Sequence, residues 1–239
     1  MFIPVFDINE RQNISLHYAT IGLIAANVVV FLLQLLVLGD NAEAGFRLIP
    51  GVFTGEYLRP EAITVVPEWA TLVTSAFLHA DFWHLFGNML FLWVFGDNVE
   101  DALGHIRFVV FYLLCAMAGG AAHILWDPDS VAPLLGASGG VAGIVSAYLV
   151  LHPRVRVWVL VLGKVPLRLP AFWIIGAWIV FQVAYALIEG DIAVAWWAHV
   201  GGIVAGVVLV LILRKPGTPI LDRGLAAEGI APDRAGPTP

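Results

Sequence analysis

The chain has 239 residues, of which 60% are apolar and 13% are charged, and its mean hydropathy is +0.88. These values exclude an ordinary soluble domain and indicate a protein with several membrane spans. The formal net charge of −6 is accompanied by no cluster of basic residues, so nucleic acid is not an expected partner. The single cysteine, Cys115, excludes a disulfide framework.

A bilayer is crossed by about 20 consecutive apolar residues. On this measure we predict an all-α membrane bundle of six transmembrane helices, at residues 18–38, 82–98, 105–126, 134–152, 171–189 and 196–213. The chain then divides into an N-terminal segment (1–17), a six-span domain (18–213) and a tail (214–239). The tail is rich in Pro, Gly and Ala, which predicts disorder. The apolar run 155–163 is short and flanked by charges and prolines, so we interpret it as interfacial.

The distribution of basic residues predicts the orientation, because positively charged loops stay cytoplasmic. With the N-terminus inside, ten of the twelve Lys and Arg residues fall on the cytoplasmic side, against Arg47 and Arg59 outside. Both termini are therefore predicted to be cytoplasmic. The N-terminal segment has no basic region typical of a signal peptide, so we expect the first span to remain as an anchor. The outer loop 39–70 is long enough that we expect structure or function in it.

Four polar side chains lie at a similar depth, near the outer ends of the spans that run inward: His84, Asn88, Ser138 and His199. Polar groups are costly in lipid and are candidates for function by default. His84 and Asn88 are four residues apart, so they share one face of a helix. The helices of Ser138 and His199 are expected to touch, because small residues let backbones approach closely; these are Gly139 and Gly143 on one helix, and Ala198, Gly202 and Gly206 on the other.

This set of side chains suits acyl transfer. A serine hydroxyl becomes a nucleophile when a nearby imidazole accepts its proton, and the imidazole then protonates the leaving amine. The Asn88 amide, the His84 ring and the Ser138 backbone N–H are candidate donors to the oxyanion. No carboxylate is predicted at the membrane depth of His199, which favours a Ser138–His199 dyad over a triad. A metal site is an alternative, but the histidines have no carboxylate or thiolate beside them, so neither metal nor cofactor is expected.

Each feature also has a structural interpretation. Glycine-rich runs such as residues 136–140 commonly pack helices together, and a lone histidine at the end of a span is commonly an interfacial residue. His84 and Asn88 could also tie helices together through hydrogen bonds. We interpret four further polar residues as structural: Asn27, Gln34, His79 and Gln182. The tryptophans lie largely toward span ends, as is typical of an aromatic belt.

Three motifs occur in order along the chain: His84-x-x-x-Asn88, Gly136-x-Ser138-Gly139 and Ala198-His199-x-x-Gly202-x-x-x-Gly206. Their combination, over residues 75–215, resembles the rhomboid family of intramembrane serine proteases. The resemblance implies a serine endopeptidase in which Ser138 is the nucleophile and His199 the general base. It also implies that His84 and Asn88 contribute to the oxyanion hole.

The same resemblance implies single-span or other membrane proteins as substrates, cut near the outer end of their transmembrane helix. It suggests a bacterial-type enzyme in the inner membrane, with the lipid bilayer as its surroundings and lateral substrate entry beside the fifth span. Glu100 matches an acidic position that has a structural role in the family. The sequence carries no signal for the oligomeric state.

Two positions depart from the pattern of many rhomboid proteins. The residue one helical turn after the serine is Ala142 instead of an aromatic residue. The His199 ring is therefore expected to be held by another side chain, or to be held more loosely. The loop 39–70 also lacks a Trp-Arg pair that many members have. The resemblance therefore does not predict the placement of this loop in the bilayer.

Two other classes of function compete with a protease. A non-catalytic rhomboid-like protein that binds transmembrane helices would use the same glycine-lined contacts but would not need the full dyad, so the presence of both Ser138 and His199 disfavours it. A small transporter would be expected to show paired intramembrane carboxylates or an internal repeat, and the sequence shows neither.

Overall fold

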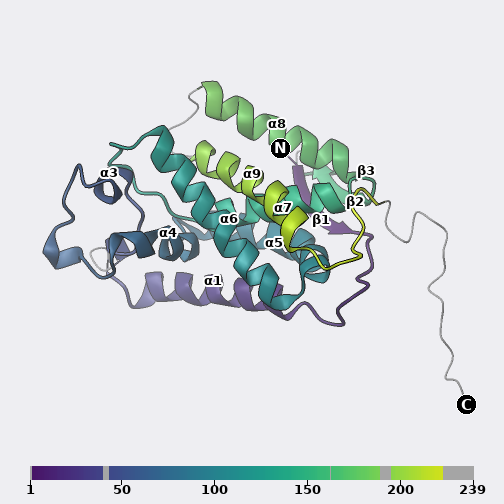
Figure 1. Cartoon of the computed structure of the whole chain (residues 1–239), viewed down its shortest axis with the longest axis horizontal. Helices are drawn as coiled ribbons and strands as arrows, with labels where there is room; N and C mark the ends of the chain where they lie inside the picture. Colours follow the sequence, from purple (N-terminus) through teal and green to yellow (C-terminus); the bar gives the residue numbers. More distant parts are fainter. Residues whose placement is uncertain (1, 40–42, 162, 189–194, 223–239) are drawn as a thin grey trace, which may run out of the picture.

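The computed structural model describes residues 2–39, 43–161, 163–188 and 195–222 (Figure 1). It is mostly helical, and each predicted span coincides with a helix: α1 (Tyr18–Leu36), α5 (Phe82–Leu103), α6 (His105–Trp126), α7 (Ser138–Leu151), α8 (Ala171–Ile188) and α9 (Trp196–Leu213). Four of these helices, α1, α6, α8 and α9, are long and apolar enough to cross a membrane. The remaining two are α5, whose last turns carry acidic residues, and α7, which has 14 residues. The chain is thus a helical membrane protein.

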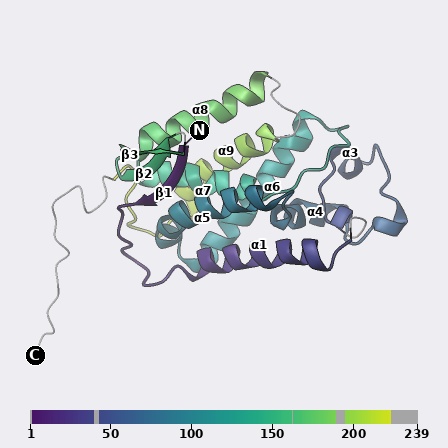
Figure 2. The ribbon, with the colours of Figure 1, turned by 180° about the vertical axis from the view of Figure 1, so that it is seen from behind.

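The short helix α7 lies in the middle of the bundle, and most of its side chains are buried. Both views place α1 and α8 along opposite edges, with α5, α6, α7 and α9 between them (Figures 1 and 2). Large side chains fill the centre, including Phe95, Phe108, Tyr112 and Tyr148, each with no more than 2% of its surface exposed. The central position of α7 brings its first residue into the interior of the bundle.

Glycines allow α7 and α9 to pack backbone against backbone. A Cβ on Gly202 would overlap the carbonyl oxygen of Gly139, and a Cβ on Gly206 would overlap that of Gly143. Such close packing of small residues is the usual means by which membrane helices associate. The predicted contact between the helices of Ser138 and His199 is confirmed.

A three-stranded sheet corrects the prediction of an all-α fold. Its strands are β1 (Phe2–Asp7), β2 (Arg156–Val161) and β3 (Val165–Pro170), in the order β1-β2-β3 with antiparallel pairing. The run 155–163, which we interpreted as interfacial, is mainly the central strand. The sheet escaped prediction because β1 comes from the predicted N-terminal segment and pairs with residues about 150 positions away. Prolines in β3 are compatible with its place at the edge of the sheet.

The start of the predicted tail packs against the bundle. Lys215 donates its backbone N–H to the Ala102 carbonyl, and Leu221 and Asp222 donate theirs to the last carbonyls of α7. His152 also pairs with the Asp222 carboxylate, with the Nδ1 and Oδ1 atoms 2.8 Å apart. Residues 214–222 are therefore part of the folded structure. The rest of the predicted tail, residues 223–239, lies outside the described residues.

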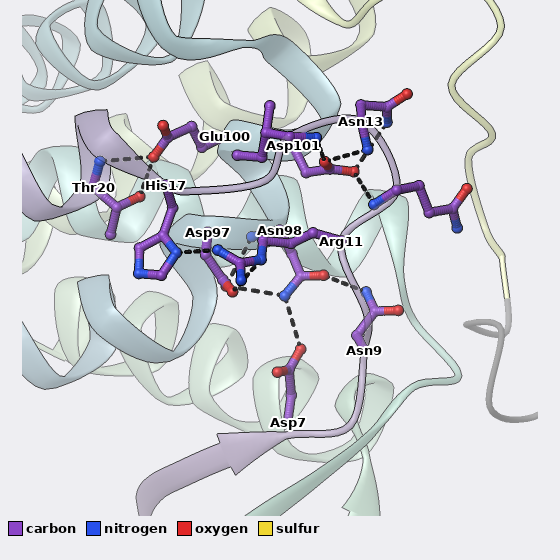
Figure 3. Close-up of polar contacts among 12 residues, drawn as sticks. Asp7, Asn9, Arg11, Asn13, His17, Thr20, Asp97, Asn98, Glu100 and Asp101 are labelled. Atoms are coloured by element: carbon purple, nitrogen blue, oxygen red, sulfur yellow. Dashed lines mark hydrogen bonds and ion pairs between the residues drawn. The ribbon is translucent and has the colours of Figure 1, made fainter. Parts of the chain in front are cut away.

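Polar residues at the C-terminal end of α5 hold the N-terminal segment in place (Figure 3). We call Asp97, Asn98, Glu100 and Asp101 the α5 polar cluster. The Asp101 carboxylate accepts hydrogen bonds from the backbone N–H groups of residues 12–14. The Glu100 carboxylate accepts from the backbone of Ala19 and Thr20, which are the first-turn N–H groups of α1. Since these groups have no carbonyl partner within their own helix, Glu100 caps α1 from a neighbouring helix.

The outer loop has short helices and one buried organising side chain. It contains α3 (Pro50–Phe53), the 3₁₀ turns η1 (Glu61–Ile63) and η2 (Glu68–Ala70), and, just beyond it, α4 (Thr71–Thr74) and η3 (Ser75–Phe77). The Arg59 side chain is 3% exposed and pairs with the Glu68 carboxylate at 2.7 Å. It also donates to the backbone carbonyls of Ala44 and Arg47. The prediction that this long loop has structure is confirmed.

Candidate active site

Helix α7 begins at Ser138, four residues later than the predicted span. Its 14 residues rise about 21 Å, which is less than the roughly 30 Å of a hydrocarbon core. Non-helical backbone at residues 127–137 leads into it, and such backbone is tolerated at membrane depth only where protein or a water-filled cavity surrounds it. As the first residue of the helix, Ser138 has a backbone N–H with no helical carbonyl to pair with.

Gly136 sets the approach to Ser138. Its φ of +126° is in the region that favours glycine. A Cβ at this position would come within 2.8 Å of His84 Nε2 and 3.8 Å of Ser138 Oγ. The glycine of the Gly136-x-Ser138 motif is therefore needed both for the turn and for the close approach of the His84 ring.

The segment before Ser138 is fixed by the outer loop. Leu48 and Leu134 exchange backbone hydrogen bonds as an isolated bridge, and Gly136 donates its N–H to the Ser75 carbonyl at 2.9 Å. The loop 39–70 thus contributes directly to the position of the serine. This provides a structural role for the loop although it lacks the Trp-Arg pair.

The start of α5 places two of the predicted residues. The Asp81 carboxylate accepts the His84 backbone N–H at 2.9 Å and so caps the helix. Asn88 follows one turn later, and its side-chain amide donates to the His84 carbonyl at 3.1 Å. One N–H of that amide is left for another acceptor, because a side-chain amide has two.

A cavity of about 890 Å³ brings the four predicted residues together. Its lining includes His84 and Asn88 from α5, Ser138 from α7 and His199 from α9. Ala142 and Gln182 also line it. The structure therefore places the four candidate site residues around one cavity.

Within the described residues, the Ser138 hydroxyl makes no hydrogen bond. The His199 ring does make one, from Nδ1 to Oε1 of Gln182 in α8, at 2.8 Å. The ring of Trp196 lies edge-on to His199, with centroids 6.0 Å apart. From the sequence we interpreted Gln182 as structural, and its contact with His199 was not predicted. A signal was available, because Gln182 is the only amide or charged side chain in α8.

His79 adds a second histidine beside His84. Their ring centroids are 5.2 Å apart in an edge-to-face arrangement, and His79 is 2% exposed. Burial, helped by the nearby His84, lowers the pKa of His79 to about 4. The His79 ring is therefore neutral at physiological pH. Its backbone is held by Gln34 of α1, which donates to the His79 carbonyl and accepts its N–H.

Comparisons with known proteins agree with the motifs. The rhomboid domain family matches residues 66–216, which is more than half of the chain. The chain is 32% identical over 169 residues to Rhomboid protein 1, mitochondrial, of Saccharomyces cerevisiae, covering 66% of this chain and 46% of that protein. It is 27% identical over 196 residues to RHOMBOID-like protein 12, mitochondrial, of Arabidopsis thaliana, covering 73% and 56%. It is 31% identical over 144 residues to Rhomboid-like protease 3 of Toxoplasma gondii, covering 60% and 51%. The chain spans about half the length of these relatives.

Proposed function

The chain belongs to the rhomboid family, and from this premise we propose that it is an intramembrane serine endopeptidase. Its substrates are membrane-anchored proteins, cut near the end of their transmembrane helix on the side where α5, α7 and α9 begin. The observation that carries this proposal is the common cavity of Ser138, His199, His84 and Asn88. The relative named as a protease supports the same activity.

In the proposed mechanism, Ser138 Oγ attacks the carbonyl carbon of the scissile peptide bond. His199 accepts the hydroxyl proton and passes it to the leaving amine, and a water molecule then hydrolyses the acyl enzyme by the reverse sequence of proton transfers. The Ser138 backbone N–H, the free N–H of Asn88 and the His84 ring donate to the oxyanion. The Ser138–His199 hydrogen bond forms when the side chains adjust in the substrate complex, since such bonds are often long in the free enzyme.

The proposal also covers the placement of the chain in the membrane. Helices α1, α5, α6, α7, α8 and α9 all cross the bilayer. Helix α7 can be short because water enters the cavity at its N-terminal end. The N- and C-termini lie on the side that carries most Lys and Arg residues, which is the cytoplasmic side. The relatives compared above that are named with a location are mitochondrial, so they give no support to the bacterial inner membrane in particular.

A fluorophosphonate probe tests the nucleophile. The purified protein in detergent should be labelled, and Ser138→Ala should abolish the labelling. Ser146→Ala is the matched control, because Ser146 is a buried serine of the same helix within hydrogen-bond distance of the Gly143 and Ile203 carbonyls. Labelling that is absent in the wild type, or that survives in Ser138→Ala, would contradict the proposal.

Cleavage of a model single-span substrate tests the reaction. Mass spectrometry of the fragments should show one cut near the end of its transmembrane helix, and the rate should fall by about 10⁴-fold or more in Ser138→Ala and in His199→Ala. A wild-type protein that binds the substrate but leaves it intact would instead indicate the non-catalytic, helix-binding alternative.

A further inference from the structure

Gln182 presents a hydrogen-bond acceptor to His199 from inside an otherwise apolar helix. The Gln182 side chain is 4% exposed, and its Oε1 atom lies 2.8 Å from His199 Nδ1. A buried amide is costly in a membrane unless it is paired. Its partner here is the ring that the proposed function assigns as the general base.

The identity of the two atoms determines the state of the ring. An amide oxygen can only accept a hydrogen bond, so Nδ1 must carry the proton. In the neutral ring the other nitrogen, Nε2, then has the free lone pair that a general base needs. The contact therefore selects the tautomer that can accept the Ser138 proton.

We propose that Gln182 is a positioning residue, which fixes the orientation and tautomer of His199 in the way that a carboxylate does in a catalytic triad. This inference rests on the proposed function. The amide performs the orienting part of that role without burying a negative charge, whose desolvation would be expensive at this depth. The contact also explains how the site can have Ala142 in place of an aromatic residue. Gln182 holds the His199 ring at Nδ1 and Trp196 flanks it, so no aromatic residue is needed one turn after the serine.

The contact links three helices at the cavity. Ser138 begins α7, His199 lies in the first turn of α9, and Gln182 comes from α8 at the edge of the bundle (Figure 1). One turn before Gln182, Trp178 packs against Phe91 of α5, with ring centroids 6.1 Å apart. The position of α8 against α5 and α9 therefore decides whether the amide reaches the imidazole.

Two substitutions at Gln182 separate acceptance of a hydrogen bond from mere filling of space. Gln182→Met keeps the size of the side chain and removes the amide, whereas Gln182→Glu keeps an oxygen acceptor. Each full-length variant is purified in detergent, and kcat and KM for the model single-span substrate are measured against pH. The other ionisable side chains of the cavity, Asp81, His84, His123, Asp127 and Tyr185, are the same in every variant and contribute equally to the profiles.

We expect Gln182→Met to lower kcat by about 10-fold to 100-fold with KM nearly unchanged, because a ring in the wrong tautomer cannot act as a base. Gln182→Glu should retain more activity than Gln182→Met. Its carboxylate stabilises the protonated ring, so the acidic limb of its pH profile should move to higher pH. The same order should appear in the rate of fluorophosphonate labelling of Ser138.

Gln34→Met is the matched control, since Gln34 is also a buried glutamine in a long helix and pairs with the backbone of His79. It should lower the thermal stability without moving the pH profile. Wild-type kcat in Gln182→Met would overturn the inference, as would equal losses in Gln182→Met and Gln182→Glu. A wild-type protein that neither cleaves nor reacts with the probe would instead overturn the proposed function, and this inference with it.

Discussion

The two ends of α5 carry similar polar residues that differ in their hydrogen-bond partners. At its first turns, Asn88 hydrogen-bonds only to the backbone of its own helix among the described residues. At its last turns, Asn98 accepts from the Asn9 amide and donates to the Asp7 carboxylate, which belong to another part of the chain (Figure 3). The first end faces a cavity of about 890 Å³, whereas the second is buried against the N-terminal segment.

This difference shows how an apolar protein uses its few polar side chains. At the α5 polar cluster, carboxylates and amides are paired with partners distant in the sequence, so they hold elements together. At the cavity, hydrogen-bonding capacity is left over, and in the proposed function a substrate uses it. We therefore expect substitutions in the cluster to reduce stability and substitutions at the cavity to reduce activity.

The largest effect is expected at Glu100. Glu100→Ala removes the acceptor for the Ala19 and Thr20 backbone N–H groups, for the Thr20 hydroxyl and for the His105 ring. Unpaired buried donors cost about 1–3 kcal/mol each in the worst case, so we expect a loss of about 3 kcal/mol or more in the free energy of unfolding. Thermal unfolding in detergent measures it. Cleavage per folded molecule should stay near that of the wild type. A Glu100→Ala variant that is fully stable but inactive would contradict the division of roles between the two ends of α5.

The next largest effect is expected at Asn88. Asn88→Ala removes a candidate oxyanion donor, and the loss of one such donor typically costs about 100-fold in rate. We expect kcat for the model substrate to fall by about this factor while the melting temperature stays close to that of the wild type. An unchanged kcat would remove Asn88 from the oxyanion hole.

Asn98→Ala is the matched control, ten residues along the same helix. It removes the hydrogen bonds to Asn9 and Asp7, so it should lower the free energy of unfolding by about 1–2 kcal/mol and leave kcat per folded molecule unchanged. If Asn88→Ala and Asn98→Ala behave alike in both measurements, the two ends of α5 do not have different tasks.

Sequence patterns that repeat locally predicted the fold well. The apolar runs located α1 and α5 to α9, and the four-residue spacing of Gly202 and Gly206 predicted the close contact of α7 and α9. The sheet was missed because strand pairing between residues 2–7 and 156–161 is set by tertiary structure and leaves no local periodic signal. The start of α7 was misplaced because residues 134–137 are apolar but not helical, and Gly136 among them has a positive φ.

The candidate site was predictable to the extent that its residues lie in motifs. His84, Asn88, Ser138 and His199 were selected from the sequence, and the structure places them at one cavity. Gln182 was not selected, because the sequence marks it as the one amide of α8 but does not show that it faces α9. A polar side chain in a span has a function or a partner, and only the three-dimensional structure identifies the partner.

The last expected effect depends on pH and concerns Asp7, which accepts a hydrogen bond from Asn98 of the α5 polar cluster. Burial, reinforced by the charge of Asp97, raises the pKa of Asp7 from 3.8 to about 7, although the Tyr148 hydroxyl and His152 act in the opposite direction. The folded protein therefore keeps this proton up to about pH 7, whereas the unfolded chain loses it near pH 3.8. Because the folded state binds the extra proton, the contribution of Asp7 to stability falls as the pH rises through this window and then levels off.

Asp7→Asn tests this linkage, because an asparagine resembles the protonated acid at every pH. The variant should lose the part of the pH dependence between about pH 4 and pH 7 and should be more stable than the wild type at pH 8. Thermal unfolding across this range measures the difference, and Asp129→Asn, at an exposed loop position, should follow the wild-type curve. Parallel curves for Asp7→Asn and the wild type would mean that the carboxylate is already ionised in the folded state. The Tyr148 hydroxyl and the Asn98 amide would then hold Asp7 as a charged carboxylate. The two ends of α5 would in that case differ only in whether their polar side chains have hydrogen-bond partners.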